Sequence, residues 1–127
     1  MEIIENKIII EILKKIDLPH AIEQGFIAYS EGKCVIPPIG ELVFDKPPGD
    51  VHIKYGYIRG ESHYVIKIAS GYWENHKLGI PNGNGMMLLF NQKTGQPLAI
   101  LLDNGILTDI RTAIAGQICA KNFSNKM

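Results

Sequence analysis

The apolar residues in the first quarter of the chain recur at the spacing of helices. The pattern predicts a first helix over residues 7–15, with Asn6 as its N-cap. A second helix is expected from Asp17 to Gly32, because Pro19 falls in the first turn, where proline is tolerated, and glycine commonly closes a helix. The apolar stripe of the first helix is Ile8, Ile9, Ile12, Leu13 and Ile16.

From Cys34 onward the pattern is that of strands separated by Pro- and Gly-rich turns. Two short runs, "CVIPP" and "ELVF", precede two hairpins. The hairpins join "VHIKYGYI" to "HYVIKIASGY" and "MMLLFN" to "PLAILLD". A last helix is expected over 108–122. This order predicts one α+β domain over residues 1–127, with two N-terminal helices, a mainly antiparallel or mixed sheet of about six strands and one C-terminal helix.

Two of the predicted strands are apolar on both faces. They are "MMLLF" and "LAILL". An antiparallel sheet in a small monomer usually leaves one face in water. The second face therefore needs a cover, and we favour another copy of the chain, which predicts a homodimer. The alternative is coverage by the chain's own N-terminal helices.

The composition is that of an ordinary globular protein and excludes several classes of partner. Hydrophobic residues make up 46% of the 127 residues, charged residues make up 20%, and 13 basic residues balance 13 acidic ones. This balance gives no support for a nucleic-acid or anionic-membrane partner. Charges interrupt the apolar N-terminus, so no signal peptide is expected, and no stretch is long enough to span a membrane.

The cysteines and histidines have no metal-ligand spacing. Cys34 and Cys119 lie far apart, which is typical of free thiols in a reducing cytoplasm, the expected location. His52 and His63 are the pair that could face each other across two strands, but no metal site is expected.

Arg111 is the first candidate binding residue. With Thr108 as the N-cap, it occupies the third position of the last helix, where the helix dipole disfavours a cation. Its neighbours are apolar or small, so an arginine and free backbone N–H groups would together form a carboxylate site. The alternative is a local ion pair with Asp109 or another surface acid.

Lys67 is the second candidate. In "YVIKIAS" it shares a strand face with Val65 and Ala69, so partial desolvation would lower its pKa and suit it to proton transfer. The alternative is an ordinary lysine on the wet face of a sheet. Lys54 raises the same question, but it shares its face with His52, which makes that face look polar.

The glycine-rich loop "LGIPNGNGMM" is no dinucleotide fingerprint. The third glycine of G-x-G-x-x-G would fall at Leu88, and a strand rather than a helix follows the loop. No Rossmann domain and no cofactor-binding residue are therefore expected in this chain.

The pieces together resemble the N-terminal half of the ornithine cyclodeaminase/mu-crystallin family. The similarity runs from about residue 51 to 121, through the lysine strand, "LGIPNGNG", "LLFNQKTGQPLAILLD" and "LTDIRTAIAG". The opening helices are similar as well. The resemblance implies a dimeric NAD(P)-dependent enzyme that acts on amino or imino acids. One such reaction converts ornithine to proline plus ammonia, and others are related oxidoreductions. The first domain of these enzymes binds substrate and dimerises.

The resemblance implies roles for four residues. Lys67 matches the active-site lysine that contacts the substrate carboxylate and assists proton transfer, and Arg111 matches an arginine that holds the same carboxylate. Asn84 lies near the position of a substrate-contacting polar residue. Family members often carry an arginine after the "PP" pair, where this chain has Ile39, and Lys54 is a candidate replacement.

The resemblance also implies that NAD(P) binds a second domain that follows the matched region. Such chains are more than twice as long, so this one is expected to be an engineered domain, a truncated product or one half of a split enzyme. It would be inactive without that second part, which a separate nucleotide-binding chain could supply. The rival hypotheses are a non-catalytic small-molecule-binding or dimeric module and an α+β domain in which Lys67 and Arg111 are incidental.

Overall fold

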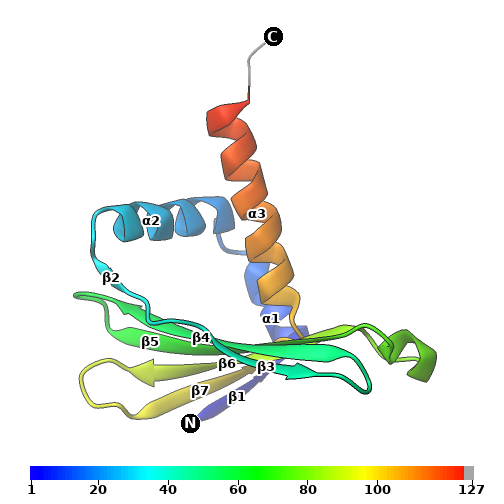
Figure 1. The fold of residues 1–127 in the computed structure, drawn as a ribbon. Coiled ribbons are helices and arrows are strands. Elements are labelled where there is room, and N and C mark those ends of the chain that lie inside the picture. The colour runs from blue at the N-terminus through cyan, green and yellow to red at the C-terminus, as the bar shows by residue number, and fades with distance from the viewer. Residues whose placement is uncertain (125–127) are drawn as a thin grey trace.

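A computed structural model describes residues 1–124 of the chain. Within these residues, three α-helices and one 3-10 turn accompany a seven-stranded mixed sheet (Figure 1). The α+β class is confirmed. The elements in chain order are β1 (Glu2–Glu5), α1 (Asn6–Leu13), α2 (Leu18–Ser30), β2 (Cys34–Val35), β3 (Gly40–Phe44), β4 (Gly49–Ile58), β5 (His63–Tyr72), η1 (Asn75–Leu78), β6 (Gly83–Asn91), β7 (Pro97–Leu102) and α3 (Ile106–Phe123).

The sheet is built mainly from consecutive hairpins. Its strand order is β1-β7-β6-β5-β4-β2, and β3 pairs with β4 on the edge that β2 also uses. Both hairpins predicted from the sequence, β4–β5 and β6–β7, form antiparallel ladders. The exception to antiparallel pairing is β1, which lies parallel to β7. The sequence analysis missed β1 because "EIIE" is short and runs directly into a helix.

The start of α1 differs from the prediction. Asn6 is not a helix cap, since the N-cap is Glu5 and no side chain caps the helix. The Asn6 amide instead donates a hydrogen bond of 2.8 Å to the backbone carbonyl of Asp103, 97 residues away. The second helix begins as expected, because the Asp17 carboxylate accepts the His20 backbone N–H and Pro19 lies in the first turn.

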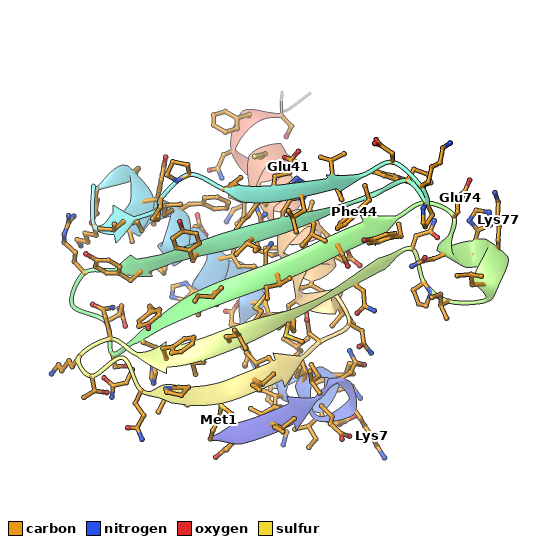
Figure 2. The ribbon with its side chains drawn as sticks, turned by 60° about the horizontal axis from the view of Figure 1, so that its bottom comes forward. Met1, Lys7, Glu41, Phe44, Glu74 and Lys77 are labelled. Carbon is orange, nitrogen blue, oxygen red and sulfur yellow. The ribbon has the colours of Figure 1, made fainter. Side chains whose placement is uncertain are left out.

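All three helices lie over the same face of the sheet, which we call the inner face (Figure 1). Helix α1 contacts β7, and α3 stands away from the sheet with α2 packed against its side. The opposite face, here the outer face, carries large side chains with no helix over them (Figure 2). By the ladder registers, its central residues are Ile53, Tyr55, Ile66, Ile68, Met86, Leu88 and Ile100. The N-terminal helices therefore do not cover this second apolar face.

The described chain buries little of its apolar surface. Ile9 and Ala99 are the hydrophobic residues of the described part that are fully buried. The accessible surface is 9158 Å², whereas a compact monomer of this mass exposes about 6,700 Å². The excess of roughly 2,400 Å² lies in the range that stable subunit interfaces bury. The fold thus exposes more surface than a free-standing domain of this mass, and many large hydrophobic side chains are among the exposed residues.

Within residues 1–124, no helix has the length and apolarity needed to cross a membrane.

Candidate substrate site

Lys67 and Lys54 occupy opposite positions in the β4–β5 ladder. The same row continues to Met87 of β6 and Leu101 of β7, so these side chains share one face of the sheet. This is the inner face, because the hollow beside Lys54 and Lys67 shares lining residues with a hollow that α2 and α3 also line. Val65 and Ala69 flank Lys67 on that face, as the alternation of the sequence predicted. Two cations are therefore placed side by side beneath the helices.

Two adjoining hollows connect this row of the sheet to the helices. The first, of about 480 Å³, lies between α2 and α3 and is lined by Phe26, Tyr29 and Arg111 among others. The second, of about 390 Å³, includes Lys54 and Lys67 in its lining. Cys34 and Ile36 line both hollows. We call the two neighbouring hollows together the site cavity; Arg111 lines the first hollow, and Lys54 and Lys67 line the second.

The surroundings lower the pKa of Lys67 below its ordinary value of 10.5. The largest cause is burial, which penalises the charged ammonium. Repulsion from Lys54 and then from Arg111 adds to the effect, and the Asp103 carboxylate opposes it. The prediction that Lys67 is partly desolvated agrees with this environment, whereas its role in proton transfer stays a prediction.

Asp103 is a functional candidate that the sequence analysis missed. Its side chain is 1% exposed, and its Oδ2 accepts the Leu107 backbone N–H at 3.0 Å. Its Oδ1 has no hydrogen-bond partner among residues 1–124. The buried Asp103 carboxylate lies between the end of β7 and the start of α3, and its charge attracts Lys67. It therefore links the sheet to α3. The sequence signal that could have drawn attention to Asp103 is the "DNG" turn directly before the last helix.

The N-cap of helix α3 lies three residues earlier than predicted, which changes the position of Arg111. The N-cap is Gly105, at φ 83°, and not Thr108, so Arg111 is the sixth residue of the helix. The N–H groups of Ile106 and Leu107 already bond to Asp103. The proposed convergence of Arg111 with free N–H groups at the helix start is therefore wrong. The Arg111 side chain itself is exposed.

The left-handed turn before α3 has a steric reason. A Cβ atom on Gly105 would lie 3.4–3.6 Å from the Asn84 backbone, and its φ is positive. Glycine therefore lets the start of α3 sit closely on β6.

The alternative pairing of Arg111 with Asp109 is not formed, since no ion pair of Arg111 occurs within the described residues.

The structure does not bring Asn84 to Lys67. Asn84 pairs with Ser70, at the alternate position of the β5–β6 ladder from Lys67 and Met87. Its side chain therefore belongs to the opposite face of the sheet, and its Oδ1 accepts the Gly85 N–H at 2.9 Å. The candidate substrate contact at Asn84 is not supported by this geometry.

The polar character of the Lys54 face is confirmed further along β4. His52 lies 3.1 Å from a carboxylate oxygen of Glu41 on β3. His52 pairs with Ala69 and His63 with Asn91, so the two histidines do not face each other. Within residues 1–124, no three His, Cys, Asp or Glu side chains are grouped as a metal site would require.

The match to a family model decides where this architecture belongs. The model of the ornithine cyclodeaminase/mu-crystallin family matches residues 3–126. The chain belongs to this family.

Individual members of the ornithine cyclodeaminase/mu-crystallin family agree with this assignment. A Sinorhizobium fredii protein described as an uncharacterized cyclodeaminase is 42% identical over 112 residues, which is 87% of this chain and 34% of that protein. The alanine dehydrogenase of Archaeoglobus fulgidus is 33% identical over 107 residues, covering 84% of this chain and 32% of the enzyme. The chain thus spans about a third of the length of the curated relatives that it matches.

Solved structures of the family share the fold. The Δ1-pyrroline-2-carboxylate reductase of Thermococcus litoralis, in complex with NADH and L-proline, matches with a TM-score of 0.88 and 26% identity over 99% of this chain and 39% of its own. An archaeal alanine dehydrogenase dimer with bound NAD matches with a TM-score of 0.84 and 27% identity, over 98% of this chain and 38% of its own.

The residues described here do not form a dinucleotide site of the kind that such cofactors usually occupy. The glycine-rich loop follows η1 and leads directly into strand β6, so among the described residues a strand and not a helix N-terminus follows it. A pyrophosphate would find neither the glycine turn nor the helix start that a Rossmann unit provides.

Proposed function

We propose that this chain is the substrate-binding and dimerisation part of an NAD(P)-dependent enzyme acting on amino or imino acids. The observation that carries the proposal is the site cavity, which joins Lys67 and Lys54 of the sheet to Arg111 of α3. The nucleotide would be held by a second domain or a separate chain. The candidate reactions are ornithine cyclodeamination and a related oxidoreduction, and the lining of the site cavity favours the second.

Each cation has a distinct role in this proposal. Arg111 binds the substrate carboxylate, since a guanidinium can offer two parallel N–H donors. Lys67 contacts the same carboxylate and moves a proton at its Nζ atom, for which its lowered pKa suits it. Lys54 adds positive charge at the position opposite Lys67, in a chain where Ile39 follows the "PP" pair.

The lining of the site cavity favours a substrate with an apolar side chain. The walls near α2 are formed by Ile22, Phe26, Tyr29 and Ile36, and no residue that lines either hollow is acidic. The second ammonium group of ornithine would find no carboxylate there, and burying an unpaired charge is costly. Alanine-like or proline-like compounds fit this lining better than diamino acids.

Calorimetry with matched ligands tests the binding role. L-Norvaline and L-ornithine share a backbone and differ in the terminal ammonium, so we expect norvaline to bind more tightly. Arg111→Ala should abolish binding, whereas Lys121→Ala removes another cation from α3, outside the lining of the site cavity, and should leave it unchanged. Binding that survives Arg111→Ala would contradict the carboxylate role.

We further propose that the outer face is covered by a second copy of the chain. The face is apolar, it lies bare of helices, and the excess surface of the domain is of interface size. The related archaeal alanine dehydrogenase is described as a dimer. Two identical outer faces packed together would bury the residues that a monomer leaves in water.

The isolated domain is expected to bind its substrate without converting it to product, because its described residues offer no dinucleotide site. Adding NAD and ornithine, or NAD and alanine, to the pure protein should give no proline, pyruvate or NADH. Formation of any of these products would overturn this part of the proposal. A protein that binds amino acids but never converts them, with or without a nucleotide-binding partner, would match the alternative of a non-catalytic module.

We propose that the protein is located in the reducing cytoplasm, where Cys34 and Cys119 remain free thiols.

A further inference from the structure

We propose that Lys67 forms a covalent imine with α-keto acids whose carboxylate is held by Arg111. The proposal rests on the carboxylate site proposed above and adds a chemical step that this chain performs without a nucleotide. It assigns a nucleophilic role to the Lys67 side chain in addition to proton transfer.

The position of Lys67 is that of an activated amine. Its neighbours on the strand face are Val65 and Ala69, and Met87 follows across the ladder. Lysines become nucleophilic in proteins when apolar surroundings desolvate them or when a second cation lies next to them. Both conditions hold here, because Lys54 occupies the directly opposite position of the ladder.

The geometry also selects between the two lysines. Like charges at directly opposite ladder positions destabilise each other, which favours loss of one proton. Lys67 is half-buried, whereas Lys54 is exposed and remains solvated. Burial and the two neighbouring cations lower the pKa of Lys67, so the uncharged amine forms preferentially at this residue.

The site cavity places a carboxylate binder near the amine. Lys67 lines one hollow and Arg111 lines the other, with Cys34 and Ile36 common to both. A ligand carboxylate on Arg111 would direct the adjacent carbonyl carbon past Cys34 and Ile36 toward the second hollow, which Lys67 borders. The apolar wall of α2 would accept the ligand's side chain. An α-keto acid has these three features on adjacent carbons.

The step is balanced without an oxidant or reductant. The lone pair of the neutral Lys67 Nζ attacks the carbonyl carbon, and the C=O π electrons move to oxygen. The oxygen takes up the proton that the attacking nitrogen releases, which gives a carbinolamine. The hydroxyl group then takes up a second proton and leaves as water while the nitrogen lone pair forms the C=N bond, and the resulting iminium nitrogen returns that proton to give the imine. One water molecule leaves, and the linkage hydrolyses by the reverse path.

Reductive trapping tests the proposal. The protein is incubated with pyruvate or 4-methyl-2-oxopentanoate and sodium cyanoborohydride, and intact mass and peptide mapping locate the adduct. We expect one adduct per chain, at Lys67, and none in Lys67→Arg, which keeps the charge but cannot form the imine. Exposed lysines such as Lys77 provide the background rate in the same molecule.

Two further comparisons separate the imine from the proposed carboxylate site. Arg111→Ala should slow trapping by roughly tenfold to a hundredfold, the range expected for loss of a charged hydrogen bond. Acetone, which lacks the carboxylate, should label Lys67 no faster than Lys77. No adduct, or equal labelling of all lysines, overturns the imine. If calorimetry still shows binding that depends on Arg111, the proposed function survives that failure.

Discussion

Lys54 and Lys67 lie directly opposite each other on the antiparallel strands β4 and β5, on the face of the sheet that the helices cover. Opposite charges or apolar pairs usually occupy such positions, because ladder partners have Cβ atoms about 5 Å apart. Here no acidic side chain lines the hollow that the lysines share. A small anion would relieve this repulsion, so stability and ligand binding should be coupled at this pair.

Lys67→Met should stabilise the domain at neutral pH. The substitution removes a partly desolvated cation and its repulsion with Lys54, and we expect a gain of about 0.2–1 kcal/mol in the free energy of unfolding. Because the pKa of Lys67 is lower in the folded protein than its ordinary 10.5, the unfolded chain binds more protons between these two values. The stability of the unmodified protein therefore rises with pH across that window.

The gain from Lys67→Met should consequently be largest below the lowered pKa and shrink as the pH approaches 10.5. Urea unfolding at pH 7 and pH 10 measures it. Lys54→Met is the matched control, since it removes the repulsion but leaves the desolvation of Lys67, and its gain should be smaller. A loss of stability in Lys67→Met at pH 7 would contradict the account.

Asp103→Ala should destabilise the start of α3. The Asp103 carboxylate accepts the Leu107 N–H, and losing a side-chain cap of this kind costs about 0.5–2 kcal/mol. Asp103→Asn keeps an acceptor oxygen and should lose less stability, while removing the charge that raises the pKa of Lys67. NMR titration of Lys67 would then show a still lower pKa. An unchanged titration would show that Asp103 acts on the helix alone.

Asn6→Ala should loosen the connection between α1 and the turn before α3. The Asn6 amide hydrogen bond to the Asp103 carbonyl is partly buried, and its loss should cost about 0.5–1.5 kcal/mol of the free energy of unfolding. Asn122→Ala is the control, because Asn122 also donates to a carbonyl at 2.8 Å but within an exposed helix turn. Equal losses in the free energy of unfolding of the two variants, measured by chemical denaturation, would show that the long-range contact adds nothing to stability.

Ile68→Lys should convert the proposed dimer to a monomer. Ile68 lies in the middle of the outer face, where a cation would be buried without a partner in the dimer. Sedimentation velocity measures the molecular mass, and circular dichroism checks the fold. Leu78→Lys places the same charge on an exposed residue of η1, away from the sheet, and should leave the dimer intact. A monomeric unmodified protein would refute the proposed interface.

Gly85→Ala should be strongly destabilising although the backbone at this position is ordinary. A Cβ atom there would lie 2.6 Å from the Ile68 carbonyl oxygen of the neighbouring strand. Overpacking of this kind typically costs about 1–3 kcal/mol. Gly83→Ala is the control two residues earlier in the same strand, with no atom within 4 Å of the added carbon. Thermal unfolding of both variants gives the comparison.

The sequence by itself determined the local patterns of this protein. The alternation in "YVIKIAS" placed Lys67 on one face with Val65 and Ala69, and the turn residues fixed both main hairpins. These features follow from periods of two and 3.6 residues and from turn chemistry, which depend on neighbours in the chain.

Tertiary structure decided the features that depend on residues far apart in the chain. The parallel pairing of β1 with β7, the bond from Asn6 to Asp103 and the start of α3 at Ile106 all arise from such contacts. The face of Asn84 depended on where β6 begins and on its register with β5. No local pattern specifies register or the packing of a helix on a sheet. Only the folded chain places the hollow that Arg111 lines next to the hollow that Lys54 and Lys67 line.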